Sequence, residues 1–80
     1  MVVEEQSRIV IDARGSFCPG PLMELIRGIR ESKVGEEIEV WSSDQGSRKD
    51  IPFWVRKAGH VLVGLFEEKD YARFVVRKAR

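Results

Sequence analysis

Two prolines separated by a single residue restrict the fold of this chain more than any other local feature. Pro19 and Pro21 flank Gly20, and Gly15 and Ser16 stand a few residues earlier. Inside a helix, proline removes a backbone donor and clashes with the preceding turn, so it is tolerated in the first helical turn and scarcely anywhere later. A loop therefore ends at this proline pair, and a helix begins there.

The residues that follow the proline pair have helical periodicity. Apolar side chains recur three or four residues apart, at Leu22, Leu25, Ile26 and Ile29. This spacing places them on one face of a helix. We expect the helix over residues 19–32, with its end near Gly35.

Strands and a second helix account for most of the remaining chain. β-branched and alternating apolar runs predict strands over residues 8–12, 36–42, 60–68 and 71–78. The run 60–68 is nearly all apolar, so we expect it to be the most buried strand. The second helix is predicted over residues 47–58, with Asp44 and Ser47 as candidate N-caps and Gly59 at its end.

This β-α-β-α-β-β order predicts an α+β fold, a two-layer α/β sandwich. Right-handed crossovers place both helices on one face of a four-stranded mixed sheet. Eighty residues are room for one domain, here residues 1–80, with residues 1–6 as a frayed lead. The other sheet face is expected to carry Val10, Trp41 and Val75 among polar residues. It is either a contact surface or an ordinary scatter of exposed apolar side chains.

Charge and cysteine content exclude several classes of protein. Fourteen Lys and Arg against 13 Asp and Glu give a net charge of +1, which argues against nucleic-acid or membrane binding by bulk charge. No apolar run has the ~20 residues of a bilayer span, and the acidic start is not a signal peptide. The only cysteine, Cys18, and the only histidine, His60, are too few for a disulfide or a zinc site. We therefore expect a soluble cytoplasmic protein without a bound metal.

Cys18 stands where the loop meets the first helix. The unpaired N–H groups and the dipole at a helix start stabilise a thiolate, which is the nucleophilic form of cysteine. We expect the free amides of Gly20 and Leu22 to face the sulfur. His60 is predicted at the far end of the sheet, so a cysteine–histidine hydrolase is not expected. A single sulfur that accepts and donates a group remains, and a persulfide fits that role. The alternative is a small buried hydrophobic residue, as free cysteines commonly are.

Segments along nearly the whole chain resemble the TusA/SirA-like sulfur carrier family. They are Asp12-Ala13-Arg14-Gly15, then Cys18-Pro19-Gly20-Pro21-Leu22 with its Cys-Pro-x-Pro signature, then Asp50-Ile51-Pro52 and Gly59-His60. The resemblance runs from about residue 9 to residue 78. Gly20 departs from the family, in which a bulkier and often charged residue is common, and this departure bears on the choice of partner.

The resemblance implies the same fold and a sulfurtransferase that carries persulfide sulfur on Cys18, with no cofactor besides that transient persulfide. The implied donor is a cysteine desulfurase or a rhodanese. The implied acceptor is a DsrE-like or heterodisulfide-reductase-like protein. The sulfur would serve tRNA thiolation, molybdenum-cofactor assembly or dissimilatory sulfur metabolism. The protein itself is expected to bind neither a membrane nor nucleic acid directly.

Several residues are candidates for supporting roles around Cys18. Arg14 either pairs with the thiolate or is simply solvated, and Asp12 is expected to accept loop amides. The loop itself is expected to be shaped by Gly15, Pro19, Gly20 and Pro21. His60 is expected to cap the end of the second helix, where a cation is favoured.

Three residues of the second helix are candidates for partner contacts. Arg48 and Lys49 open that helix, where cations are disfavoured, so they either attract an acidic partner or phosphate or form a solvated turn. Phe53 lies opposite the inner face of the helix, as a docking anchor or as a singly exposed aromatic. Two other functions stay open: a small RNA-binding module, and a regulatory adaptor whose thiol senses oxidants.

Overall fold

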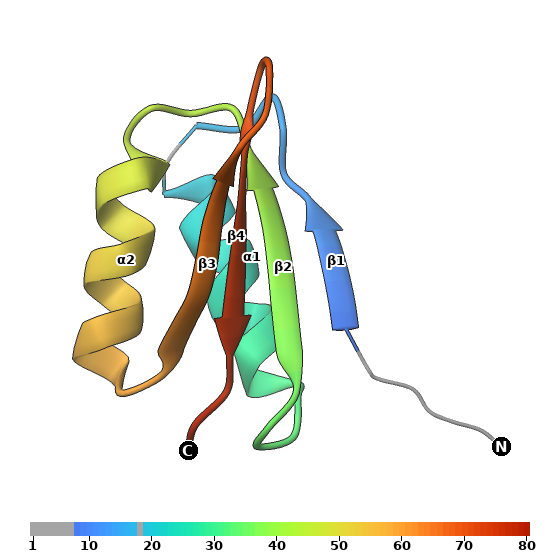
Figure 1. Ribbon diagram of the computed structural model, residues 1–80, viewed down its shortest axis with the longest axis vertical. Helices are drawn as coiled ribbons and strands as arrows, with labels where there is room; N and C mark the ends of the chain where they lie inside the picture. Colours follow the sequence, from blue (N-terminus) through green and yellow to red (C-terminus); the bar gives the residue numbers. More distant parts are fainter. Residues whose placement is uncertain (1–7, 18) are drawn as a thin grey trace, which may run out of the picture.

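The computed structural model describes residues 8–17 and 19–80; Cys18 and the predicted frayed lead, residues 1–6, lie outside this part of the chain. The elements follow the predicted order (Figure 1). They are β1 (Arg8–Asp12), α1 (Gly20–Arg30), β2 (Glu37–Ser42), α2 (Ser47–Ala58), β3 (Val61–Glu67) and β4 (Ala72–Arg77). Each predicted boundary lies within two residues of the observed one.

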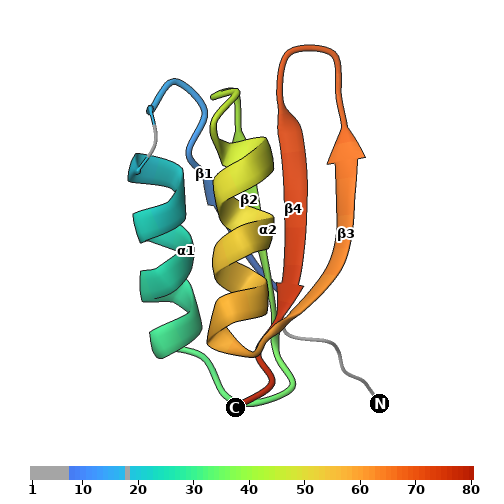
Figure 2. The same cartoon turned by 90° about the vertical axis from the view of Figure 1, so that its left-hand side faces the viewer.

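The four strands form one mixed sheet in the order β1-β2-β4-β3. β1 is parallel to β2, while β4 pairs antiparallel with both β2 and β3. Both helices lie on the same face of this sheet (Figure 2). The predicted two-layer sandwich is therefore confirmed.

The prediction that the third strand is the most buried is wrong. β3 lies at the edge of the sheet, and β2 and β4 occupy the centre. Val61, Val63 and Phe66 of β3 are exposed, whereas Phe74 of β4 is fully buried. An all-apolar run does not distinguish an edge strand from a central one, because the position in the sheet depends on pairing with distant residues.

The core lies between the helices and the sheet, with its largest fully buried side chains drawn from both layers. These include Leu25, Ile38, Ile51, Val55 and Phe74. Gly28 lets α1 approach the sheet closely, because a Cβ at this position would lie 3.1 Å from Ile11 Cδ1 and 3.3 Å from Ile38 Cγ2. Of the predicted apolar face of the first helix, Leu25 and Ile29 are buried and Leu22 packs against the core, whereas Ile26 is only half-buried.

The start of α2 differs from the prediction, and its end agrees with it. Neither Asp44 nor Ser47 caps the helix with its side chain; Ser42 Oγ instead donates to Ser47 Oγ at 2.8 Å in the buried interior. Gly59 ends the helix in the left-handed region with a φ of 83°, which favours glycine. In the described part of the chain, neither helix is long and apolar enough to cross a membrane.

Candidate functional site

The loops that follow β1 and β2 meet at one end of the sheet, where α1 and α2 both begin (Figures 1 and 2). This follows from the parallel pairing of β1 with β2, since the carboxyl ends of parallel strands lie together. β3, which begins one residue after His60, starts at the opposite end. The predicted separation of His60 from the Cys18 loop is therefore confirmed.

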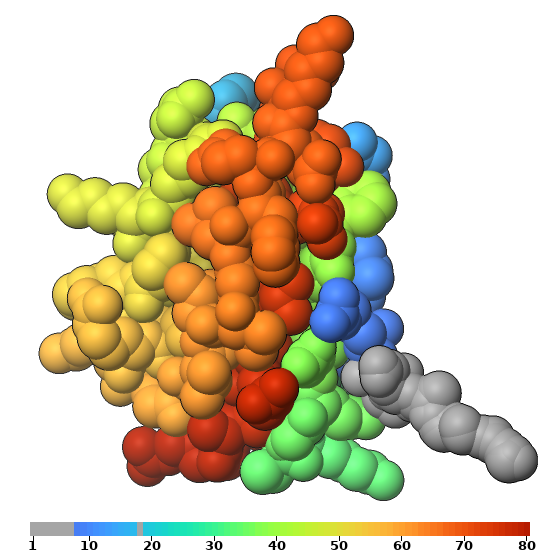
Figure 3. Space-filling view, in the orientation of Figure 1, coloured from blue at the N-terminus to red at the C-terminus, as the bar shows by residue number. Residues whose placement is uncertain are grey.

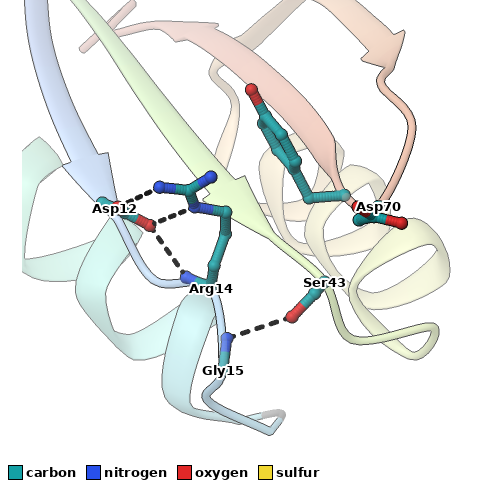
Figure 4. Close-up of a pocket in the computed structure, with 6 residues that line it drawn as sticks. Asp12, Arg14, Gly15, Ser43 and Asp70 are labelled. Carbon is teal, nitrogen blue, oxygen red and sulfur yellow. Dashed lines mark hydrogen bonds and ion pairs between the residues drawn. The ribbon is translucent and has the colours of Figure 1, made fainter.

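Asp12 and Arg14 form a compact ion pair at the start of this loop (Figure 4). Arg14 Nε donates to Asp12 Oδ1 at 2.9 Å and Nη2 to Oδ2 at 2.8 Å, while the Arg14 amide donates to Oδ1 at 3.1 Å. The bonds from the guanidinium and from this amide lower the pKa of Asp12 to about 2. The expectation that Asp12 accepts a loop amide is confirmed. Arg14, rather than being simply solvated, has its charge offset by a neighbour.

The Arg14 guanidinium also contacts two aromatic rings contributed by the sheet and the loop before β4. Its Cζ lies 4.9 Å from the ring centroids of both Trp41 and Tyr71, which are themselves 5.5 Å apart. Arg14 thus has cation–π contacts in addition to its carboxylate. Sequence reasoning placed Trp41 on this face but missed Tyr71, because only the β2–β4 pairing brings residue 71 to the end of β2.

A second link ties the Cys18 loop to the loop before α2. Gly15 has a φ of 89°, and its amide donates to Ser43 Oγ at 3.0 Å (Figure 4). Gly15, Ser43 and Tyr71 line an open pocket of about 540 Å³ together with Asp12, Arg14 and Asp70. Sequence reasoning missed Ser43, since no local signal pairs its hydroxyl with an amide 28 residues earlier.

The backbone around the proline pair forms a tight turn into α1. The Gly20 amide donates to the Phe17 carbonyl at 2.7 Å, so the prediction that it is free for the sulfur is wrong. Pro19 is exposed and Pro21 fully buried, which anchors the helix start to the core. Phe17 is 80% exposed. The Cys18 sulfur, and with it the expected approach of the Leu22 amide and of Arg14, lies outside the described residues.

The structure separates the three candidate partner-binding residues of α2. Arg48 donates from Nε and Nη2 to the Glu67 carboxylate, at 2.9 and 2.7 Å, and so joins α2 to β3. Lys49 is exposed and has no ion pair within residues 8–17 and 19–80. Phe53 is 56% exposed, with Lys57 Nζ 5.9 Å from its ring centroid.

His60 closes the end of α2 as expected, but through its backbone amide, which donates to the Val55 carbonyl at 3.0 Å, and not as a cation. His60 Nδ1 accepts a hydrogen bond from the Ala79 amide at 3.1 Å, and its ring lies 5.7 Å from that of Trp54. Burial lowers the pKa of His60, and the charges of Lys78 and Arg80 lower it further. The neutral imidazole is therefore favoured, and backbone bonds at Gly59 and His60 complete the helix end instead.

The sheet face opposite the helices is covered largely by its own ion pairs. Glu39 is only 5% exposed and accepts bonds from Arg8, Arg73 and Trp41 Nε1, at 3.1, 3.2 and 2.6 Å. Burial opposes the charged form of Glu39, but these bonds outweigh it and lower its pKa. Val75 is 1% exposed, so the expectation that it contributes to an open apolar face is wrong. Val10 does remain exposed.

The fold and the sequence both match known proteins. A crystal structure of a SirA-like protein from Desulfitobacterium hafniense superposes with a TM-score of 0.77 over 90% of this chain and 99% of that one, at 19% identity. This similarity defines the fold class, a SirA-like two-layer sandwich.

The sequence comparisons define the family. The model of the family "Sulfurtransferase TusA" matches residues 9–78. A putative sulfur carrier protein from Archaeoglobus fulgidus is 58% identical over 72 residues, covering 90% of this chain and 99% of that protein. The sulfur carrier protein TusA of Pseudomonas entomophila is 37% identical over 68 residues, covering 85% of each. The chain therefore belongs to the TusA family of sulfur carrier proteins, and the predicted resemblance is confirmed.

Proposed function

We propose that this protein carries sulfur as a persulfide on Cys18 and passes it from a donor protein to an acceptor protein. The observation that supports this most is the combination of family membership with a single cysteine inside the Cys-Pro-x-Pro segment. Because the chain has no second cysteine, the transferred sulfur has only one side chain on which it can travel as a persulfide.

Each transfer balances without an added oxidant or reductant. The Cys18 thiolate attacks the outer sulfur of a donor persulfide, a new S–S bond forms, and the donor's own S–S bond breaks with the electron pair leaving on the donor thiolate. The proton of the donor persulfide stays with the transferred sulfur. In the second step an acceptor thiolate attacks that sulfur in the same way and releases the Cys18 thiolate.

The surroundings of Cys18 favour the thiolate that both steps require. α1 begins at Gly20 and has no acidic residue in its first turn, so nothing there offsets the positive end of the helix dipole. The charge of Asp12, six residues before Cys18 in the chain, is offset by Arg14. Phe17 and Pro19, which flank Cys18 in the chain, are exposed, and this suits approach by a partner protein.

The donor we propose is a cysteine desulfurase or a rhodanese, and the acceptor a DsrE-like or heterodisulfide-reductase-like protein. The cytoplasm suits this chemistry because its thiols are kept reduced. Among the candidate partner contacts of α2, Lys49 and Phe53 remain exposed, while the charge of Arg48 is offset by Glu67. We therefore propose Lys49 and Phe53, rather than Arg48, as the residues of α2 that contact a partner protein.

Intact-mass measurement tests the proposal directly. The protein is incubated with a cysteine desulfurase and free cysteine, and separately with a rhodanese and thiosulfate. We expect an added mass of one sulfur atom that disappears on reduction and does not form on Cys18→Ser. Failure of every donor to load the wild-type protein, or equal loading of Cys18→Ser, would contradict it.

A further inference from the structure

A second pocket lies at the end of the molecule opposite the Cys18 loop. It has a volume of about 320 Å³ and lies between the last turns of α1, the side of α2 and the segment after β4. The final residues pass beneath the two helices here (Figures 1 and 2), and Figure 3 shows them as the red atoms below α2. Its lining residues are Ile26, Ile29, Arg30, Trp54, His60, Lys78 and Arg80.

The lining carries three cations and no carboxylate side chain. Arg30 and Arg80 have no ion pair with any residue of the described chain, and Lys78 Nζ donates to the Ser32 carbonyl at 2.7 Å. Of the arginines outside this lining, all but Arg56 are paired with a carboxylate in the described chain. The paired arginines are Arg8, Arg14, Arg27, Arg48, Arg73 and Arg77. Arg30, Lys78 and Arg80 thus converge on this pocket without an ion pair among the described residues.

The helix dipole explains only part of this cluster. Arg30 lies in the last turn of α1, where a cation is favoured, but Lys78 and Arg80 belong to the segment beyond β4. These two charges act on His60, whose pKa they lower in addition to the effect of burial. The positive electrostatic potential inside this concave, partly aromatic pocket favours the binding of an anion.

The cationic segment is held in place by specific bonds. The Lys78 amide donates to the Glu36 carbonyl at 2.9 Å, the Lys78 carbonyl accepts from Gly35 at 2.7 Å, and the Ala79 amide donates to His60 Nδ1. Gly59 leaves room for Arg80, because a Cβ at residue 59 would lie 2.9 Å from both Cδ and Nη1 of Arg80. The backbone of this segment and the Lys78 ammonium are therefore positioned before any ligand arrives, which reduces the entropic cost of binding.

We propose that this pocket binds a phosphate group, either of a small phosphorylated molecule or of an RNA backbone. A phosphomonoester dianion offsets more of the three positive charges than one carboxylate does, and the oxygens of either a monoester or the singly charged diester of RNA suit the forked donors of Arg30 and Arg80. Because His60 Nδ1 accepts from Ala79, the proton of the neutral ring is on Nε2, which adds a further donor. The site is independent of Cys18 and of the proposed sulfur transfer.

NMR titration of the full chain at constant ionic strength tests the site with inorganic phosphate, AMP and a short single-stranded RNA. We expect saturable shifts of the Trp54 indole N–H and the His60 ring signals. Bound phosphate is expected to raise the pKa of His60, since it offsets Lys78 and Arg80. Arg30→Gln should weaken phosphate binding about tenfold, the usual effect of one charge-assisted hydrogen bond.

Arg27→Gln is the matched control, because Arg27 is on the same helix and exposed but is paired with Glu24 outside the pocket lining. It should leave phosphate binding unchanged. Tighter binding of RNA than of AMP assigns the site to a polynucleotide, and equal binding assigns it to a small ligand. Shifts that do not saturate, equal effects of Arg27→Gln and Arg30→Gln, or tighter binding of a hexaglutamate peptide than of phosphate would each overturn the proposal.

Discussion

The two ends of this small domain differ in whether their arginine side chains form ion pairs. At the end that holds the Cys18 loop, Asp12 is matched by Arg14 and Glu67 by Arg48. At the other end, Arg30 and Arg80 meet no carboxylate of the described chain. A net charge of +1 conceals this asymmetry, because carboxylates without an ion pair in the described chain, such as Asp50 and Asp70, offset the surplus cations of one end.

This difference suits different kinds of ligand. Where Asp12 and Arg14 offset each other, the field at the start of α1 remains the main electrostatic influence expected on the Cys18 thiol. At the end where cations converge without ion pairs, the binding of an anion from solution is most favourable. The predictions below change the pairing, or the cations, at one end and measure the response there.

The largest effect on stability is expected from Glu39→Gln, which breaks the most buried of the ion pairs. The amide oxygen of this variant would still accept from Trp41 Nε1, but the charge that faces Arg8 and Arg73 would be lost. We expect the free energy of unfolding to fall by about 2 kcal/mol in urea denaturation. The control is Glu68→Gln, at the exposed partner of Arg73, which should cost no more than about 0.5 kcal/mol. Equal costs would show that burial does not strengthen the Glu39 pairs.

The next effect comes from a matched pair of glycine substitutions, one at each end. Gly15 and Gly59 have φ values of 89° and 83°, so alanine at either position should cost about 1–2 kcal/mol of unfolding free energy. An added Cβ meets nothing within 4 Å at residue 15 but reaches Arg80 at residue 59. Gly59→Ala alone should therefore weaken phosphate binding in the NMR titration. Equal loss of binding in both variants would indicate that the loss comes from general destabilisation.

A smaller effect is expected on the reactivity of Cys18 when the Asp12–Arg14 pair is broken. Asp12→Asn leaves the Arg14 charge uncompensated, so the midpoint of the pH profile for Cys18 alkylation should fall by up to about half a pH unit. The pKa of Asp12 is about 2, so in the wild type the pair remains intact throughout that profile. The double variant Asp12→Asn, Arg14→Gln restores neutrality and should return the midpoint to the wild-type value. A double variant that shifts as far as the single one would contradict this explanation.

The sequence predicted the elements well because their signals are local. The proline pair marks the start of α1, the apolar spacing that includes Leu25 and Ile29 marks its inner face, and Gly59 marks the end of α2. The prediction that β3 is the most buried strand was wrong because the burial of a strand depends on its neighbours in the sheet. Asp44 and Ser47 have the right chemistry for caps, but Ser47 is engaged in the core by Ser42.

The site was predictable only where its residues are close in sequence. Asp12, Arg14 and the proline pair follow from one short segment, whereas Tyr71 and Ser43 reach it through strand pairing and loop contact. The prediction that His60 is a cation failed for the same reason. A helix end favours a cation, but the segment after β4 brings Lys78 and Arg80 against the ring, and this contact between distant residues outweighs the local preference.

The smallest effect is the pH dependence of stability that arises from His60. Its pKa in the folded protein lies below the value of 6.5 expected for the unfolded chain, so the unfolded state binds more protons between these two values. Stability should therefore be complete above pH 6.5 and decrease as the pH falls through the folded pKa. Comparing urea denaturation of the wild type with that of His60→Gln, whose side-chain oxygen can still accept from Ala79, isolates this contribution. Phosphate should reduce the dependence in the wild type, because a bound anion favours the protonated ring. An identical pH slope for the two proteins would contradict the folded-state pKa and remove one argument for the positive field in the pocket.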